Sequence, residues 1–252
     1  MAIALLHDMM HKEVEVYVED MFVKTVTRGE HINHLRKFFE RIKKYKLRLN
    51  LNKCTFGVTA GRLLGHMVSS RGIEVDPTKI KAIMEMPPPK TEKEIRGFLG
   101  RLQYISRFIA RLTITCEPIF KLLKKGESKE WTKNCQKAFE AVKEYLSNPP
   151  VLAPPKPRRP LNLYLSVIED ALGSMLAQED EDKQEHAIYY LSKRLKDYET
   201  RYTAAKKLCF TLVWAVQKLR HILLAHQVLV VARMDPLKYL FEKPALTGKL
   251  SR

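Results

Sequence analysis

Several features of secreted, disulfide-bonded and membrane-spanning proteins are missing from this sequence. Its 252 residues include only four cysteines, Cys54, Cys116, Cys135 and Cys209. Their wide spacing excludes a CxxC-type zinc site and gives no sign of a disulfide framework. No run approaches the roughly 18 apolar residues of a membrane span, and the first residues lack the layout of a signal peptide. We therefore expect an intracellular protein with reduced thiols and no membrane anchor.

Acidic residues are scarce relative to basic ones. The chain carries 45 lysine and arginine residues against 28 aspartate and glutamate residues, a formal net charge of +17. A small domain needs a net charge of only about 2 to 8 for solubility. The hydrophobic content of 45% is enough for packed cores and argues against a disordered chain. The excess positive charge instead indicates a polyanionic partner, with nucleic acid as the first class to consider.

Proline marks the one obvious linker. Six of the 13 prolines lie between positions 149 and 160. Proline excludes helix interiors and favours an extended spacer. The sequence therefore predicts a domain boundary at 149–160.

The first segment of the chain predicts a short hairpin. Apolar residues alternate over 13–18, and a second apolar run covers 21–23. Glu19 and Asp20 lie between the two predicted strands, where a hairpin reverses. Two adjacent carboxylates are thus expected at a hairpin tip.

Further elements follow before the linker. Apolar residues at helical spacing predict an amphipathic basic helix over 31–45. Glycine-punctuated strands are expected at 48–51, 54–58 and 63–69. Asp76 is expected to cap one helix, and Thr91 with Glu94 to form a capping box for another. Later helices are predicted near 117–124 and 133–147.

After the linker, the pattern changes to strands followed by a long helix. The predicted elements are strands at 161–167, 173–178 and 186–191, a helix at 203–224, a strand at 228–231 and a short helix at 236–241. This is the element order of an RNase H-like α/β domain. Element order alone does not fix function.

Glu19 and Asp20 are the first candidates for chemistry. Two divalent ions that catalyse phosphoryl transfer need several carboxylates at one edge of a rigid sheet, and a tight turn supplies two from neighbouring positions. An isolated Glu-Asp pair is more often a solvated acidic turn. The sequence around the pair decides between these interpretations.

YVED at 17–20 resembles the YxDD box of reverse transcriptases. The stretches LRLNLNKCTFGV at 47–58, LLGHMVSSRGIEVDPTKI at 63–80, MPPPKTEKEIRGFLGRLQYISRFI at 86–109 and PPVLAPP at 149–155 resemble plant gypsy-type LTR retrotransposon Pol polyproteins. These motifs occur in the family's order and at its intervals. The resemblance covers essentially all 252 residues.

This resemblance implies a fold and a domain organisation. We expect an α+β palm–thumb portion of a reverse transcriptase followed by an α/β RNase H-like domain. The expected parts are the C-terminal part of the palm at 1–80, thumb or connection helices at 81–148, the linker at 149–160 and an RNase H-like tether at 161–252. The fingers and a third metal-binding aspartate of the palm are expected upstream of Met1.

The resemblance also implies site residues for polymerisation. In the family, Mg²⁺ is held by the two YxDD carboxylates, which fall on Glu19 and Asp20. Only Asp20 keeps the family identity. The extra methylene of Glu19 displaces its carboxylate oxygens by roughly an ångström, and misplacement on that scale can cost about 10²-fold in rate. We therefore expect Mg²⁺ to bind weakly or not at all.

Other residues are implied in nucleic-acid binding. Leu64, Gly65 and His66 fall on the hairpin that grips the primer terminus, although His66 is equally well read as an ordinary polar strand residue. Arg96 and Arg101 lie on the helix that runs along the minor groove of the template–primer. Lys43 and Lys44 belong to a basic stretch that reads either as a solvated helix face or as a phosphate-binding surface.

The three metal-ligand positions of an active RNase H fall on Ser166, Leu208 and Arg233. Glu169, Asp170 and Asp235 lie nearby, but a shift of one residue turns a strand side chain to the opposite face of the sheet. We therefore expect a catalytically inactive RNase H-like domain that acts as a tether.

Three functional hypotheses fit these residues. The first is a reverse transcriptase fragment that is inactive alone and binds an RNA–DNA hybrid or a DNA template–primer, with other Pol domains as further partners. The second is a domesticated nucleic-acid-binding protein, and the third is a decayed transposon remnant without a selected function. The sequence does not separate them.

Overall fold

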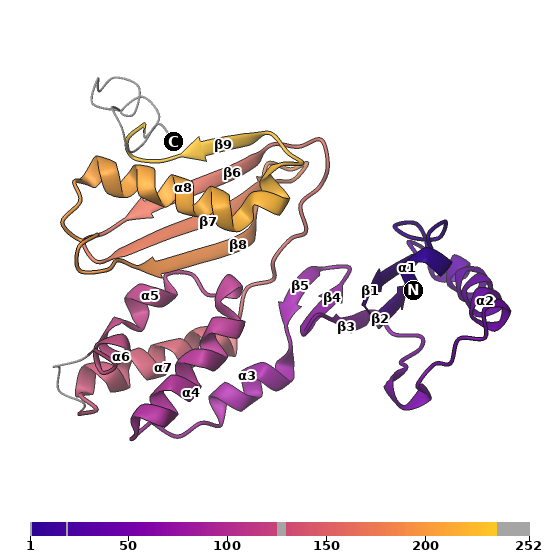
Figure 1. The fold of residues 1–252 in the computed structure, drawn as a ribbon, viewed down its shortest axis with the longest axis horizontal. Helices are drawn as coiled ribbons and strands as arrows, with labels where there is room; N and C mark the ends of the chain where they lie inside the picture. The colour runs from indigo at the N-terminus through magenta and orange to yellow at the C-terminus, as the bar shows by residue number, and fades with distance from the viewer. Residues whose placement is uncertain (1, 19, 125–129, 236–252) are drawn as a thin grey trace. The chain divides into compact units, whose positions relative to one another are not determined.

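The computed structural model describes residues 2–18, 20–124 and 130–235 (Figure 1). The chain divides into two compact units, Met1–Leu63 and Leu64–Arg252. No helix within the described ranges is long and apolar enough to cross a membrane. Each unit is described by itself below.

The first unit contains a two-stranded hairpin packed on a helix. Its elements are α1 (Ala2–Leu5), β1 (Val14–Tyr17), β2 (Asp20–Val23), α2 (Arg28–Lys44), the 3₁₀ turn η1 (Leu51–Lys53) and β3 (Ala60–Leu63). β1 and β2 are antiparallel, with Val14 opposite Val23 and Tyr17 opposite Asp20. Phe38 and Ile42 of α2 are buried with Val14. The predicted hairpin and basic helix are confirmed.

The strands expected at 48–51 and 54–58 are wrong. Residues 51–53 form the turn η1, because the Asn50 side chain accepts a hydrogen bond from the backbone N–H of Asn52 at 3.1 Å and bends the chain locally. Gly57 has a φ of 65°, a conformation that interrupts a strand. Local side-chain bonding therefore outweighs the strand propensity of this segment.

The second unit begins with a hairpin and a helical bundle. Its first elements are β4 (His66–Ser69), β5 (Gly72–Val75), α3 (Pro77–Met84), α4 (Glu92–Tyr104), the 3₁₀ turn η2 (Ser106–Phe108), α5 (Leu112–Thr115), α6 (Glu117–Lys121) and α7 (Lys133–Ser147). The Asp76 side chain accepts from the backbone N–H of Thr78, and Thr91 forms the predicted capping box with Glu94. Both predicted helix starts are confirmed.

Large apolar side chains from α4, η2 and α7 form the core of the bundle. Phe98, Phe108 and Phe139 are each at most 2% exposed, and the rings of Phe98 and Phe139 lie 5.0 Å apart. The apolar residues of this segment continue to Phe108, but the α-helix ends at Tyr104 and the following residues form η2. The tighter turn keeps Phe108 in the core.

A mixed four-stranded sheet completes the second unit. Its elements are β6 (Leu161–Val167), β7 (Ala171–Glu179), β8 (Glu185–Arg194), α8 (Ala204–Leu223) and β9 (Val228–Val231). The strand order is β8-β7-β6-β9, with β9 parallel to β6 and the other pairs antiparallel. In Figure 1, α8 lies across one face of this sheet. The RNase H-like fold is confirmed, and the helix expected at 236–241 lies outside the described residues.

The proline-rich linker is extended, as predicted, but it is packed against its neighbours. Leu152 is fully buried and exchanges two backbone hydrogen bonds with Ile73 of β5, at 2.8 and 2.9 Å. The next residue, Ala153, donates its N–H to the carbonyl of Ala187 in β8 at 2.8 Å. The linker therefore joins the hairpin of this unit to the edge of its sheet.

Leu152→Ala tests this packing. We expect it to lower the free energy of unfolding of the second unit by about 2–5 kcal/mol, because it opens a cavity in the bundle core. Val151→Ala is the matched control, since Val151 is 41% exposed and should change stability by no more than about 0.5 kcal/mol. Both tryptophans, Trp131 and Trp214, lie in the second unit, so urea unfolding followed by tryptophan fluorescence reports on it. Equal stabilities of the two variants would show that the linker is a free spacer.

Candidate functional site

Asp20 lies at the tip of the β1–β2 hairpin. It is the first residue of β2, pairs with Tyr17 across the hairpin, and its side chain is exposed. Val18 has a φ of 55°, a left-handed conformation that tightens the turn. Glu19 lies outside the described residues. The structure thus places one of the two predicted carboxylates at a sheet edge.

The described residues do not fit a Mg²⁺ centre. In the parts of the chain that the structure describes, no three His, Cys, Asp or Glu side chains come together to hold a metal ion. Two-metal phosphoryl transfer needs several converging oxygen ligands. Asp20 alone cannot supply them.

The predicted grip residues form a tight turn held by α4. Leu64 and Gly65 have φ values of 52° and 75°. The Tyr104 hydroxyl of α4 donates a hydrogen bond to the Leu64 carbonyl at 3.3 Å. A Cβ atom on Gly65 would overlap that hydroxyl. Only glycine both adopts the left-handed φ at position 65 without strain and leaves room for the Tyr104 hydroxyl. The hydrogen bond from Tyr104 to Leu64 fixes the turn to the end of α4.

His66 is packed between aromatic rings. Its ring stacks on Tyr104 at 6.1 Å between centroids and lies 5.4 Å from Phe108. Its Nδ1 is buried and has no hydrogen-bond partner among the described residues. Burial and the nearby charge of Arg107 lower the pKa of His66, while Asp76 opposes them. We conclude that His66 is neutral at pH 7 and supports the turn by packing.

One face of α4 carries two exposed glycines and therefore has few side chains. Lys93, Gly97, Gly100 and Tyr104 follow one another at spacings of four, three and four residues, so they lie along one side of the helix. Gly97 and Gly100 are exposed, and a Cβ at either position would meet nothing within 4 Å. Each glycine costs the helix about 1 kcal/mol relative to alanine. This face, which we call the α4 face, exposes backbone to a closely approaching partner.

The two predicted arginines of α4 make intramolecular contacts. Arg96 forms an ion pair with Glu92 at 2.7 Å, one turn earlier on the helix. Arg101 donates to the carbonyl of Ala82 at 2.7 Å and so ties α4 to α3. Their role in nucleic-acid binding stays a prediction.

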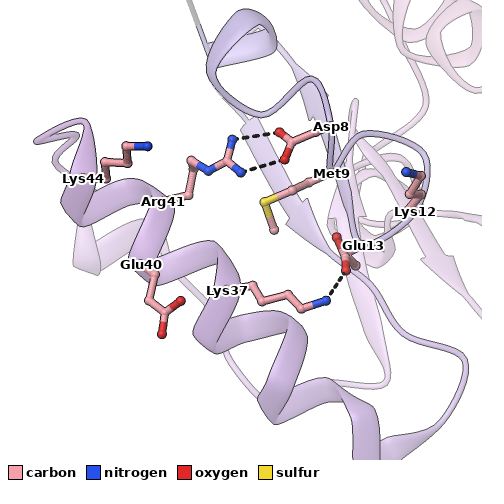
Figure 2. Close-up of a pocket in the computed structure, with 8 residues that line it drawn as sticks. All are labelled: Asp8, Met9, Lys12, Glu13, Lys37, Glu40, Arg41 and Lys44. Carbon is pink, nitrogen blue, oxygen red and sulfur yellow. Dashed lines mark hydrogen bonds and ion pairs between the residues drawn. The ribbon is translucent and has the colours of Figure 1, made fainter.

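Lys43 and Lys44 lie at the C-terminal end of α2. Both are exposed, and neither forms an ion pair within the described ranges. Figure 2 shows a polar hollow beside this helix, where Arg41 makes two 2.7 Å bonds to Asp8. The Arg41 guanidinium lowers the pKa of Asp8. The carboxylate of Asp8 is thus already paired with Arg41, while Lys43 and Lys44 remain available to an anion.

The three residues predicted to occupy RNase H ligand positions lie in different surroundings. Ser166 is exposed on β6 opposite Gly173, Leu208 is a residue of α8 buried in the core with leucines of the sheet, and Arg233 is exposed after β9. Next to Leu208, the buried Lys207 donates to the carbonyl of Glu169 at 2.8 Å. These three predicted positions therefore supply a hydroxyl, an alkyl group and a cation, and their role stays a prediction.

Gly65→Ala tests the coupling of the turn to α4. We expect a loss of at least about 2 kcal/mol, because a left-handed backbone costs alanine about 1–2 kcal/mol and the new methyl group overlaps the Tyr104 hydroxyl. In a Tyr104→Phe background the overlap is reduced, so the same substitution should cost less. Urea unfolding of the four proteins gives this double-mutant cycle. Additive effects would contradict the contact.

A second prediction concerns pH. Because the pKa of folded His66 is below the value of about 6.5 for an unfolded histidine, the unfolded state binds more protons below that pH. The stability contributed by neutral His66 should be present above pH 6.5 and be lost as the pH falls below it. We expect His66→Gln to flatten the fall in unfolding free energy between pH 7.5 and 5.5. His221→Gln, at an exposed position, should leave the fall unchanged. An unaltered slope in His66→Gln would refute this account.

Two family models match the chain. Residues 2–101 match the family described as reverse transcriptase (RNA-dependent DNA polymerase). Residues 131–230 match the RNase H-like domain found in reverse transcriptase. Together they cover most of both compact units.

Curated relatives and solved structures agree with this order. The chain is 32% identical over 249 residues to the retrovirus-related Pol polyprotein from transposon 297 of Drosophila melanogaster, covering 98% of this chain and 23% of that protein. It is 25% identical to the transposon Tf2-3 polyprotein of Schizosaccharomyces pombe, covering 98% and 18%. The chain thus spans about a quarter or less of these relatives.

The solved structures show the fold. A foamy viral protease-reverse transcriptase in complex with dsDNA has a TM-score of 0.82 at 21% identity, over 98% of this chain and 52% of that one. The enzyme in complex with an RNA/DNA hybrid has a TM-score of 0.79 at 22% identity, over 98% and 34%. The chain therefore matches the segment of retrotransposon Pol polyproteins in which a reverse transcriptase is followed by an RNase H-like domain.

Proposed function

We propose that the chain binds a template–primer duplex, either DNA or an RNA–DNA hybrid, along the α4 face and the turn at 64–66. The observation that carries this proposal is the pair of uncovered glycines, Gly97 and Gly100, between Lys93 and Tyr104. The solved reverse transcriptases of similar fold were determined with dsDNA and with an RNA/DNA hybrid.

The chemistry of the α4 face suits a duplex groove. Without side chains at two positions, the helix backbone can approach a wide, shallow minor groove such as that of an A-form hybrid. Lys93 at one end can pair with a phosphate, and the net charge of +17 favours polyanions generally. Contacts of this kind position a duplex without reading its sequence.

We propose that the parent family of this chain catalyses RNA-directed DNA polymerisation. Reverse transcriptases generally use divalent metal ions, but Glu19 stands at the position of a family aspartate. We propose that this chain does not polymerise DNA by itself, and that residues 161–252 serve as an inactive tether because Ser166, Leu208 and Arg233 replace the carboxylates. The motifs at 47–58 and 86–109 support a gypsy-type element of plant origin.

The boundaries at 80, 148 and 160 belong to the same proposal. They divide the chain into palm, thumb or connection helices, linker and RNase H-like tether. The packing of α3 to α7 around one core supports the part assigned as thumb or connection helices. The compact unit Leu64–Arg252 includes the β4–β5 hairpin as well.

Gly97→Leu tests duplex binding. We expect at least a tenfold weaker affinity for a template–primer duplex, equal to about 1.4 kcal/mol, because the side chain blocks the close approach. The same change should raise helix stability by up to about 0.8 kcal/mol, since leucine is the better helix former. Fluorescence anisotropy at 100 mM salt gives the affinity, and thermal unfolding gives the stability.

Gly29→Leu is the matched control. Gly29 is also an exposed helical glycine with open space around it, but it lies on α2. We expect unchanged duplex affinity. Wild-type affinity should fall by about 10³-fold or more between 50 and 200 mM salt if 6 to 10 phosphates are contacted. Equal binding by the two leucine variants would reject the α4 face as the duplex site.

A further inference from the structure

Two exposed tyrosines, Tyr198 and Tyr202, lie in the segment between β8 and α8. The Tyr198 side chain is 55% exposed and that of Tyr202 is 38% exposed. They are four residues apart, and neither belongs to the α4 face or to the predicted grip turn. Neither tyrosine is accounted for by the duplex-binding proposal.

A buried carboxylate holds this segment in a fixed shape. Glu199 is only 4% exposed, and its side chain accepts the backbone N–H of Lys196 at 2.7 Å and the ammonium of Lys193 at 3.3 Å. Its carbonyl accepts the N–H of Tyr202 at 3.1 Å. Both tyrosines are therefore presented from an ordered backbone, which reduces the entropy lost on binding.

The rings are supported by aromatic and cationic neighbours. Tyr202 meets the ring of Phe210 edge-on, with centroids 6.4 Å apart and an interplanar angle of 89°. The Lys193 ammonium lies 4.2 Å from the centroid of the Phe210 ring, and that of Lys196 lies 5.6 Å from the Tyr198 ring. These contacts restrict the rings while leaving much of each exposed.

Basic residues lie close to the two tyrosines along the chain. Lys196, Arg201 and Lys206 are exposed, and within the described ranges none of the three forms an ion pair or a side-chain hydrogen bond. The exposed acid of the segment, Asp197, is paired with Lys124 at 3.2 Å. The segment thus combines accessible aromatic rings with uncompensated cations.

We propose that Tyr198 and Tyr202 form a binding site for single-stranded nucleic acid, separate from the α4 face. Unpaired bases stack on the two rings, and Lys196, Arg201 and Lys206 neutralise the adjoining phosphates. A duplex is a poor ligand here, because its bases are stacked on one another and offer no free faces. Stacking on tyrosine is tolerant of sequence, since every base has a π face.

The test measures the affinity of the full chain for three probes by fluorescence anisotropy. The probes are a 12-nucleotide oligo(dT), a 12-unit oligomer with the same backbone but no bases, and a blunt DNA duplex. We expect the double variant Tyr198→Ala, Tyr202→Ala to bind oligo(dT) at least tenfold more weakly, because stacking contributes about 5- to 150-fold per base. Its affinities for the abasic oligomer and the duplex should change by less than twofold.

Matched variants separate stacking from folding. Tyr198→Phe with Tyr202→Phe keeps both rings and should retain oligo(dT) binding within twofold. Phe56→Ala removes another exposed aromatic ring, and it should have no effect. Changing Lys196, Arg201 and Lys206 to glutamine should reduce the salt slope of oligo(dT) binding by about two, since each single-strand phosphate contributes about 0.7.

Three results would overturn the proposal. The first is oligo(dT) binding by the double alanine variant within twofold of wild type. The second is an equal loss for oligo(dT) and the abasic oligomer, which would show that no base stacks on these rings. The third is an unchanged salt slope in the glutamine variant. Loss of duplex binding in Gly97→Leu with normal oligo(dT) binding would leave this site intact, so the two proposals fail separately.

Discussion

The turn η2 contacts both the β4–β5 hairpin and the RNase H-like sheet of the second unit. Phe108 lies in the bundle core and touches His66 of the predicted grip hairpin. Its neighbour Arg107 places its guanidinium carbon 4.6 Å from the centroid of the Tyr189 ring in β8. Two successive side chains therefore join the hairpin and the sheet edge to one core. If η2 were repacked, the hairpin would lose the His66–Phe108 contact and the RNase H-like sheet would lose the Arg107–Tyr189 contact.

This packing also explains the limits of prediction from sequence. Elements with strong local signals were predictable, such as the helices capped at Asp76 and Thr91 and the strands of the large sheet. The docking of Leu152 on Ile73 was not, because both partners come from distant parts of the chain and proline content indicates only an extended backbone. The segment around Asn50 was missed because a side-chain bond to the backbone replaced strand pairing.

The candidate site likewise contains features that the sequence predicted and features that only the structure shows. The resemblance indicated Asp20, the turn at 64–66 and the lost carboxylates, and the structure adds how the turn is held. Tyr104 was missed as the residue that fixes Gly65, since this contact joins residues about 40 positions apart. The glycines of the α4 face could have been found from their helical spacing. The tyrosines at 198 and 202 could not be singled out from the sequence, because the burial of Glu199, which orders their segment, is seen only in the structure.

The central claim is that a duplex lies along the α4 face and against the turn at 64–66. Hydrogen exchange measured by mass spectrometry on the full chain, with and without a template–primer duplex, tests it most directly. We predict slower exchange on binding in peptides covering 93–104 and 64–66, with no change in β6 and β7, whose backbones lie within the sheet. Binding that leaves the exchange of 93–104 unchanged would contradict the account.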